Sequence, residues 1–291
     1  TVEFNSAVQG PIESIFMENR AGYPFKAAEA FRKLETATEK LIEETSDPDN
    51  AYSRWSLEDG GQATLTRALE QLSADTSVPT FLRTLSDALA TTAELTSDLE
   101  ARLALGYNVT PLSVQVVKGT SGSRGSYTAF SNTLKIRTDK DITKSAVTLL
   151  HETIHQRSSA VLHAMGWISK ERFRRQNKDM SEETFQRIWA HYLANAKSFI
   201  EKNPELYKKA IELDKLRLQA FEQLRNQLIA QGVDVDAKME NIFNDKLDGS
   251  ETDRLLYGLS SLTEFVTHVM TDKKVMEFLN TVESKIGRAH V

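Results

Sequence analysis

The stretch TLLHETIHQRSS, residues 148–159, holds two histidines four positions apart, with a glutamate directly after the first. It lies within a helix that we predict over residues 142–165, because Asp and Thr residues suited to an N-cap precede it and Gly166 follows it. Four positions make little more than one helical turn, so His151 and His155 share one face, with Cβ atoms about 5–6 Å apart. Two imidazoles placed in this way can bind one cation.

Glu152 completes an HExxH pattern, which is typical of zinc hydrolases. Its side chain is rotated by roughly 100° from His151 around the helix, so it can address a water on the metal instead of the metal itself. Zinc lowers the pKa of a bound water to about 7, and a nearby carboxylate can accept the proton as hydroxide attacks a carbonyl. The alternative is an ordinary amphipathic helix with two packed histidines and an exposed glutamate.

A zinc site needs a third protein ligand, and Glu264 is the best candidate. It lies in LTEFVTHVM, residues 262–270, where a carboxylate among apolar residues is costly unless a partner or a metal compensates it. We predict that His268, one helical turn further on, hydrogen-bonds a ligand or the reacting carbonyl. Two alternatives stay open: His268 is itself the ligand, or both side chains are exposed on a helix that only packs nearby.

The remaining candidates fit a metal site less well. Metzincins continue the motif with glycine at position 158 and histidine at position 161, where this chain has Ser158 and Val161. His163 lies about two turns beyond His155, and His191 is surrounded by aromatic and apolar residues. We expect both of these histidines to serve packing.

The composition argues against several other classes of function. Hydrophobic residues make up 40% and charged residues 26%, which fits a soluble globular protein, and the net charge of −5 gives no electrostatic reason to expect nucleic acid. The chain has no cysteine, so a metal must be held by His, Asp or Glu, and a reducing compartment is suitable. No apolar run approaches the ~20 residues of a membrane span, and we expect no membrane partner.

A short β region precedes the motif. Residues 112–117 form a strand by pattern, and residues 127–137 form a strand, a Ser-Asn turn and a second strand. Most of the remaining chain has helical periodicity, including residues 25–44, two long antiparallel helices over 167–231 and a last helix over 255–283. The sequence therefore predicts an α+β fold that is predominantly helical.

The order GSYTAFSNTLKI, then LLHETIH, then YGLSSLTEFVTHVM resembles zincin-like metallopeptidase domains, most closely those embedded in large phage polyvalent proteins. The resemblance covers roughly residues 105–165 and 255–280. It implies a gluzincin-type site, with zinc on His151, His155 and Glu264 and with Glu152 as general base. The long spacer between the two matched parts is attributed to an inserted helical hairpin.

This resemblance also sets the predicted domains. A helical region over residues 1–104 precedes a zincin-like domain over 105–285, with a small sheet before the HExxH helix and a helical insertion over about 167–250. Residues 286–291, IGRAHV, match read-through into a common sequencing adapter and are left out of the fold reasoning. We expect the chain to be a piece of a larger polypeptide.

In a zincin-like fold, the strand with Leu134 and Ile136 is expected to be the sheet edge beside the metal, where an extended polypeptide substrate could add as a strand. Tyr127 and Tyr257 are candidate oxyanion donors, but we expect both to pack in the core.

The sequence thus predicts a zinc-dependent metallopeptidase within a larger, phage-derived polypeptide, located in a virion or a reducing compartment. Its substrate would be that polypeptide, another virion protein or a host protein. The alternative is a non-catalytic zincin scaffold whose long helices serve assembly. Glu152 favours the enzyme, because a structural zinc site has no need of it.

Overall fold

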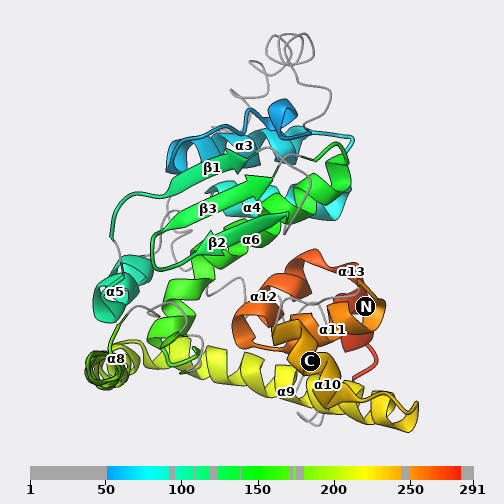
Figure 1. Cartoon of the computed structure of the whole chain (residues 1–291). Coiled ribbons are helices and arrows are strands. Elements are labelled where there is room, and N and C mark those ends of the chain that lie inside the picture. The colour runs from blue at the N-terminus through cyan, green and yellow to red at the C-terminus, as the bar shows by residue number, and fades with distance from the viewer. Residues whose placement is uncertain are drawn as a thin grey trace. The chain divides into compact units, whose positions relative to one another are not determined.

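The computed structural model describes residues 51–91, 96–107, 109–117, 124–137, 139–168, 170, 173–174, 180–243 and 249–282. This part is mostly helical and holds one small sheet, as predicted (Figure 1). The chain divides into two compact units, one ending at Val161 and the other beginning at Leu162. The predicted helix over residues 25–44 and the tail 286–291 lie outside the described residues, and the predicted domain boundary at residue 105 stays a prediction.

In the first unit, a short 3-10 helix, η1 (Ala51–Trp55), precedes three α-helices, α3 (Gln62–Ala74), α4 (Thr80–Thr91) and α5 (Thr96–Leu105). Helices α3 and α4 pack against each other through leucines that recur at helical spacing. The fully buried ones include Leu65, Leu69, Leu72 and Leu82.

The sheet of the first unit has three strands, β1 (Ser113–Val117), β2 (Gly125–Thr128) and β3 (Thr133–Arg137), in the order β1-β3-β2. The predicted hairpin is confirmed: β2 runs antiparallel to β3, and Asn132 in the turn has a positive φ of 51°. The expectation that the strand with Leu134 and Ile136 is the sheet edge is wrong. Strand β1 pairs parallel to β3 on its other side, so β3 is central and both residues are fully buried.

Helix α6 (Ile142–Ala164) carries the HExxH motif and agrees with the predicted span to within one residue. The carboxylate of Asp141 accepts a hydrogen bond from the backbone N–H of Lys144 at 3.0 Å, which satisfies a free donor of the first turn. At the other end Gly166 adopts a φ of +99°, which suits glycine and ends the helix. Figure 1 shows α6 running alongside the sheet.

Among the described residues of the second unit, every secondary-structure element is a helix. The unit contains α8 (Glu182–Lys202), α9 (Pro204–Ala230), α10 (Val235–Phe243), α11 (Glu251–Leu259), α12 (Leu262–Thr271) and α13 (Lys273–Leu279). The two long helices are present, but their predicted antiparallel packing is wrong. Figure 1 shows α8 nearly end-on while α9 lies across the view, so the two helices meet at a large angle.

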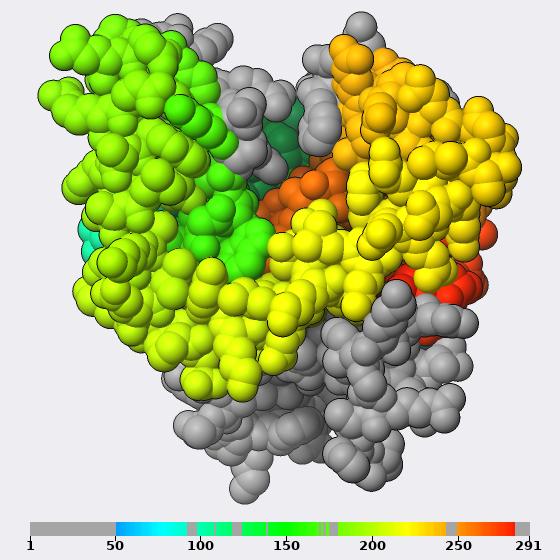
Figure 2. Space-filling model, turned by 90° about the horizontal axis from the view of Figure 1, so that it is seen from below, coloured from blue at the N-terminus to red at the C-terminus, as the bar shows by residue number. Residues whose placement is uncertain are grey.

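Helix α9 packs instead against α10, α11 and α12. Figure 2 shows α9 in yellow, with part of α12 visible in orange beside it. The helical hairpin of the prediction is therefore replaced by a long helix that supports the C-terminal helices.

The single last helix that the sequence predicts is in fact three helices. The chain breaks before α12, where the Ser261 hydroxyl accepts a hydrogen bond from the backbone N–H of Glu264 at 3.3 Å. It breaks again before α13, where Asp272 accepts one from the backbone N–H of Lys274 at 2.9 Å. Such side chains offer the backbone a partner that competes with a continuing helix. As a result, Glu264 lies in the first turn of α12 instead of mid-helix.

Candidate metal centre

The histidines of the HExxH motif lie on one face of α6, as the spacing predicts. The ring centroids of His151 and His155 are 4.8 Å apart, and the rings meet edge to face at 76°. His155 is buried and His151 is half-buried. Imidazole nitrogens are good ligands for zinc, so this pair offers two donors one turn apart.

Glu152 lies against the strand β2, a contact that the sequence does not reveal. A Cβ atom at Gly125, the first residue of β2, would lie 2.7 Å from Cγ of Glu152 and 3.1 Å from its Oε1. Glu152 is only 6% exposed. The glycine at position 125 is therefore what leaves room for this carboxylate beside the edge of the sheet.

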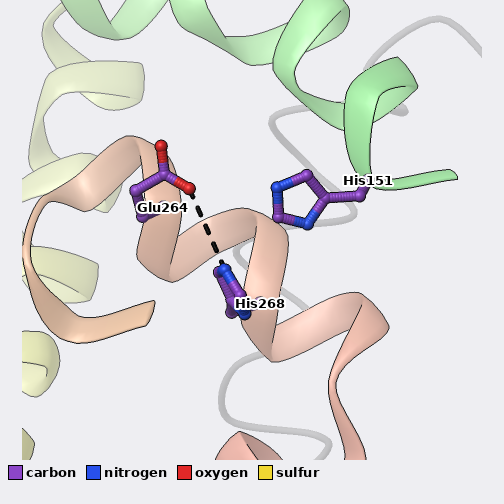
Figure 3. A group of neighbouring side chains, drawn as sticks. All are labelled: His151, Glu264 and His268. Atoms are coloured by element: carbon purple, nitrogen blue, oxygen red, sulfur yellow. Dashed lines mark ion pairs between the residues drawn. The ribbon is translucent and has the colours of Figure 1, made fainter. Parts of the chain in front are cut away.

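Glu264 and His268 are both buried on α12, so the alternative of two exposed side chains is wrong. Oε2 of Glu264 lies 3.9 Å from Nε2 of His268, and Figure 3 marks this contact with a dashed line. Glu264 lies in the first turn of α12, where the positive end of the helix dipole interacts favourably with acidic side chains. The pair offers one carboxylate oxygen and one imidazole nitrogen on the same face of α12.

Asp272 is the site residue that sequence reasoning missed. Its Oδ2 lies 3.7 Å from Nδ1 of His268 and 3.7 Å from Nε of Arg254. Burial by itself would raise the pKa of Asp272, but His268, the backbone N–H of Lys274 and Arg254 outweigh it and lower the pKa. The i, i+4 spacing from His268 was the available signal, because residues four apart face each other on a helix.

The environment of His268 on the neighbouring helix is equally specific. The ring of Tyr257 meets the imidazole edge to face, with centroids 5.4 Å apart. A Cβ atom at Gly258 would lie 3.1 Å from both Cβ and Cγ of His268, so glycine allows α11 to pack closely here. Both contacts restrict the rotation of the imidazole.

The other candidate residues either have structural roles or lie on the surface. His163 is buried, and its carbonyl accepts a hydrogen bond from the Tyr192 hydroxyl at 2.7 Å, which agrees with a packing role. His191 is exposed, so the packing role expected for it is wrong, because it lies on the outer face of α8. The Tyr127 hydroxyl bonds with Arg102 and with Oδ1 of Asn132, which supports its structural role.

The candidate donors thus form two groups, each within one unit. His151, Glu152 and His155 lie on α6 in the first unit, and Glu264 and His268 lie on α12 in the second. His151 and His155 lie one turn apart, as do Glu264 and His268, and these imidazole nitrogens and the carboxylate oxygen suit zinc. Their union on one ion stays a prediction.

Across the described ranges, no helix has both the length and the apolar character that a membrane crossing requires. Comparison with known protein families, with curated proteins and with solved structures finds no match.

Proposed function

We propose that this chain is a zinc-dependent peptidase of the zincin type. In the proposal, His151 and His155 of α6 bind one zinc ion together with Glu264 of α12, and Glu152 acts as general base. A bound zinc ion would supply Lewis acidity and lower the pKa of a water ligand to about 7.

The observation that carries the proposal is the placement of Glu152. A buried carboxylate is costly, and a purely structural zinc site has no use for one beside its histidines. Here the Glu152 carboxylate of α6 contacts the first residue of β2, and β2 is an edge strand of the sheet. It can therefore accept a proton from a water and deliver it to the leaving amine of a peptide held along that edge.

The edge strand supports the proposal of a polypeptide substrate. Among the described residues, β2 pairs with β3 on one side only, so its other side can receive an extended peptide as an added strand. This replaces β3 by β2 as the strand that we expect to bind the substrate. The backbone hydrogen bonds of such pairing favour a polypeptide over a small amide.

The test separates metal binding from chemistry. Purified protein should hold near one zinc per chain. Glu152→Gln should keep the zinc and lose the hydrolysis of a broad peptide library, by about 10²–10⁴-fold. Glu264→Ala should lose most of the zinc. Protein that binds no zinc would end the proposal.

A second candidate function has one observation in its favour. Nε2 of His268 faces Glu264, and a fourth protein ligand would give the closed coordination of structural zinc sites. In that case the chain is a non-catalytic metal-binding module for assembly. It then binds zinc, but wild type and Glu152→Gln behave alike toward every peptide. The predicted parent, a larger phage polypeptide, stays a prediction under either function.

A further inference from the structure

Three polar residues line one face of α12 and its C-terminal end at intervals of four. Glu264, His268 and Asp272 are all buried or nearly so, with side chains 7%, 11% and 14% exposed. Because residues at this spacing lie one above the other, the imidazole stands between two carboxylates. Nε2 faces Glu264 at 3.9 Å, and Nδ1 faces Asp272 at 3.7 Å.

This placement decides the orientation of the ring. A rotation of the imidazole by 180° about its Cβ–Cγ axis would put carbon atoms where the two nitrogens now face the carboxylates. Both electrostatic contacts would be lost together. The contacts of Tyr257 and Gly258 with His268 confine the ring further from the neighbouring helix.

The two carboxylates differ in their other partners. Asp272 also faces Arg254 and accepts the backbone N–H of Lys274 as the N-cap of α13, so it is fixed at a helix junction. A neutral imidazole next to a fixed acceptor carries its proton on the nitrogen that faces it, which is Nδ1.

We propose that Asp272 is a positioning residue that holds His268 in the Nδ1–H tautomer, so that the Nε2 lone pair of His268 and the carboxylate of Glu264 form a two-ligand half-site for zinc. The inference rests on the proposed function for the identity of the metal. It makes His268 a metal ligand, where the sequence predicts a hydrogen-bonding residue.

The distances fit two ligands of one ion. Two donors at zinc bond lengths of about 2.0–2.2 Å and a tetrahedral angle lie about 3.4 Å apart. The 3.9 Å between Nε2 of His268 and Oε2 of Glu264 needs a closure of only a few tenths of an ångström. With His151 and His155 the ion would have four protein ligands. A zinc ion held in this way would admit water only as a fifth ligand, a coordination that zinc can adopt during reaction.

The tautomer of His268 can be measured without metal or substrate. Long-range ¹H–¹⁵N correlation spectra of the zinc-free full chain, at mildly alkaline pH, distinguish a protonated from an unprotonated ring nitrogen. The proposal expects Nδ1 protonated and Nε2 unprotonated, with the Nε2 signal shifting when zinc chloride is added. A protonated Nε2, or an Nε2 signal unchanged by zinc that binds stoichiometrically, would overturn it.

Variants of Asp272 test the positioning role. Asp272→Ser keeps an N-cap side chain for α13 but is too short to hold the imidazole, so zinc affinity should fall about 10–100-fold. Asp272→Asn keeps an acceptor oxygen and should recover part of this loss. Arg254→Gln removes the other partner of Asp272 and should change the affinity by less than about threefold. Wild-type affinity and tautomer in a folded Asp272→Ser would refute the role.

The outcomes also separate this inference from the proposed function. A chain that shows the Nδ1–H tautomer of His268 but never binds zinc contradicts both the peptidase and the zinc half-site, and leaves only the positioning of His268 by Asp272 intact. A chain that binds zinc and cleaves peptides with Nε2 of His268 protonated contradicts the positioning and leaves the peptidase intact.

Discussion

Replacing Gly125 by alanine should disable Glu152 without removing the metal. The new Cβ would lie 2.7 Å from Cγ of Glu152 and 2.8 Å from Cγ2 of Thr148. Carbon atoms in ordinary contact are about 3.5–4.0 Å apart, so one or both side chains must move by roughly 1 Å. The histidines of the motif are not among the three atoms nearest to this Cβ.

The displacement has two measurable consequences. Overpacking of this kind lowers the free energy of unfolding by about 1–3 kcal/mol, measured by urea denaturation. A shift of about 1 Å in a catalytic group costs on the order of 100-fold in rate, so kcat/KM for a cleaved peptide should fall by that factor. Zinc content should remain that of the wild type, because the metal ligands keep their places.

A second substitution separates the two effects. Thr148→Ser removes Cγ2, so Gly125→Ala combined with it should recover part of the lost stability, with a coupling energy above about 0.5 kcal/mol. The rate should stay low, because the contact with Glu152 remains. Gly61→Ala is the matched control: its nearest contact is the backbone oxygen of Leu112 at 3.2 Å, away from the motif, and hydrolysis should be unchanged.

Two results would refute this reasoning. If Gly125→Ala is as stable and as active as the wild type, Glu152 does not lie beneath β2. If Gly125→Ala loses its zinc together with its activity, the substitution has displaced the histidines as well as Glu152.

The remaining predictions concern stability. Arg102→Met should lower the free energy of unfolding by about 3–5 kcal/mol in urea denaturation, because it removes the guanidinium that lies 2.8 Å from the buried carboxylate of Asp98. Arg67→Met removes a surface ion pair and should lower it by less than about 1 kcal/mol. Burial raises the pKa of Asp75, but hydrogen bonds, led by those from Ser77, outweigh it, so the pKa is lowered overall. The ionised side chain therefore stabilises the fold above the unfolded pKa of about 3.9, and this stabilisation is lost as the pH falls through the folded pKa. Asp75→Asn should therefore be less stable than wild type at neutral pH and equal to it in strong acid. Chelation of zinc should lower the melting temperature, and re-addition of zinc chloride should restore it, unless the chain holds no metal.

The motif helix could be predicted from the sequence because its geometry is local. The helical period alone places His151 and His155 on one face, and the start and stop residues of α6 are adjacent in the chain. The burial of Glu264 and His268 follows from their apolar neighbours. These features need no knowledge of distant contacts.

The wrong predictions concern features of the fold that depend on contacts with distant residues or on competing hydrogen bonds. The order of the strands depends on the parallel pairing of β1 with β3, which no local pattern encodes. The breaks at Ser261 and Asp272 depend on side chains that cap a helix in competition with its continuation. The role of Gly125 was hidden because its neighbour Glu152 is far along the chain.

The predicted hairpin of long helices failed for a related reason. Periodicity shows that α8 and α9 each have an apolar face but not which partner covers it. Helix α9 uses its face for α10, α11 and α12, and so supports the helix that carries Glu264.

In the proposed site, one zinc ion is shared by residues from α6 and α12. Anomalous diffraction at the zinc absorption edge, from crystals grown with zinc chloride, tests this directly. A shared ion predicts one peak within about 2.0–2.3 Å of ligand atoms of His151, His155 and Glu264, and of Nε2 of His268 if the half-site on α12 is correct. A peak whose ligands all come from one of the two helices, or no peak at all, would contradict it.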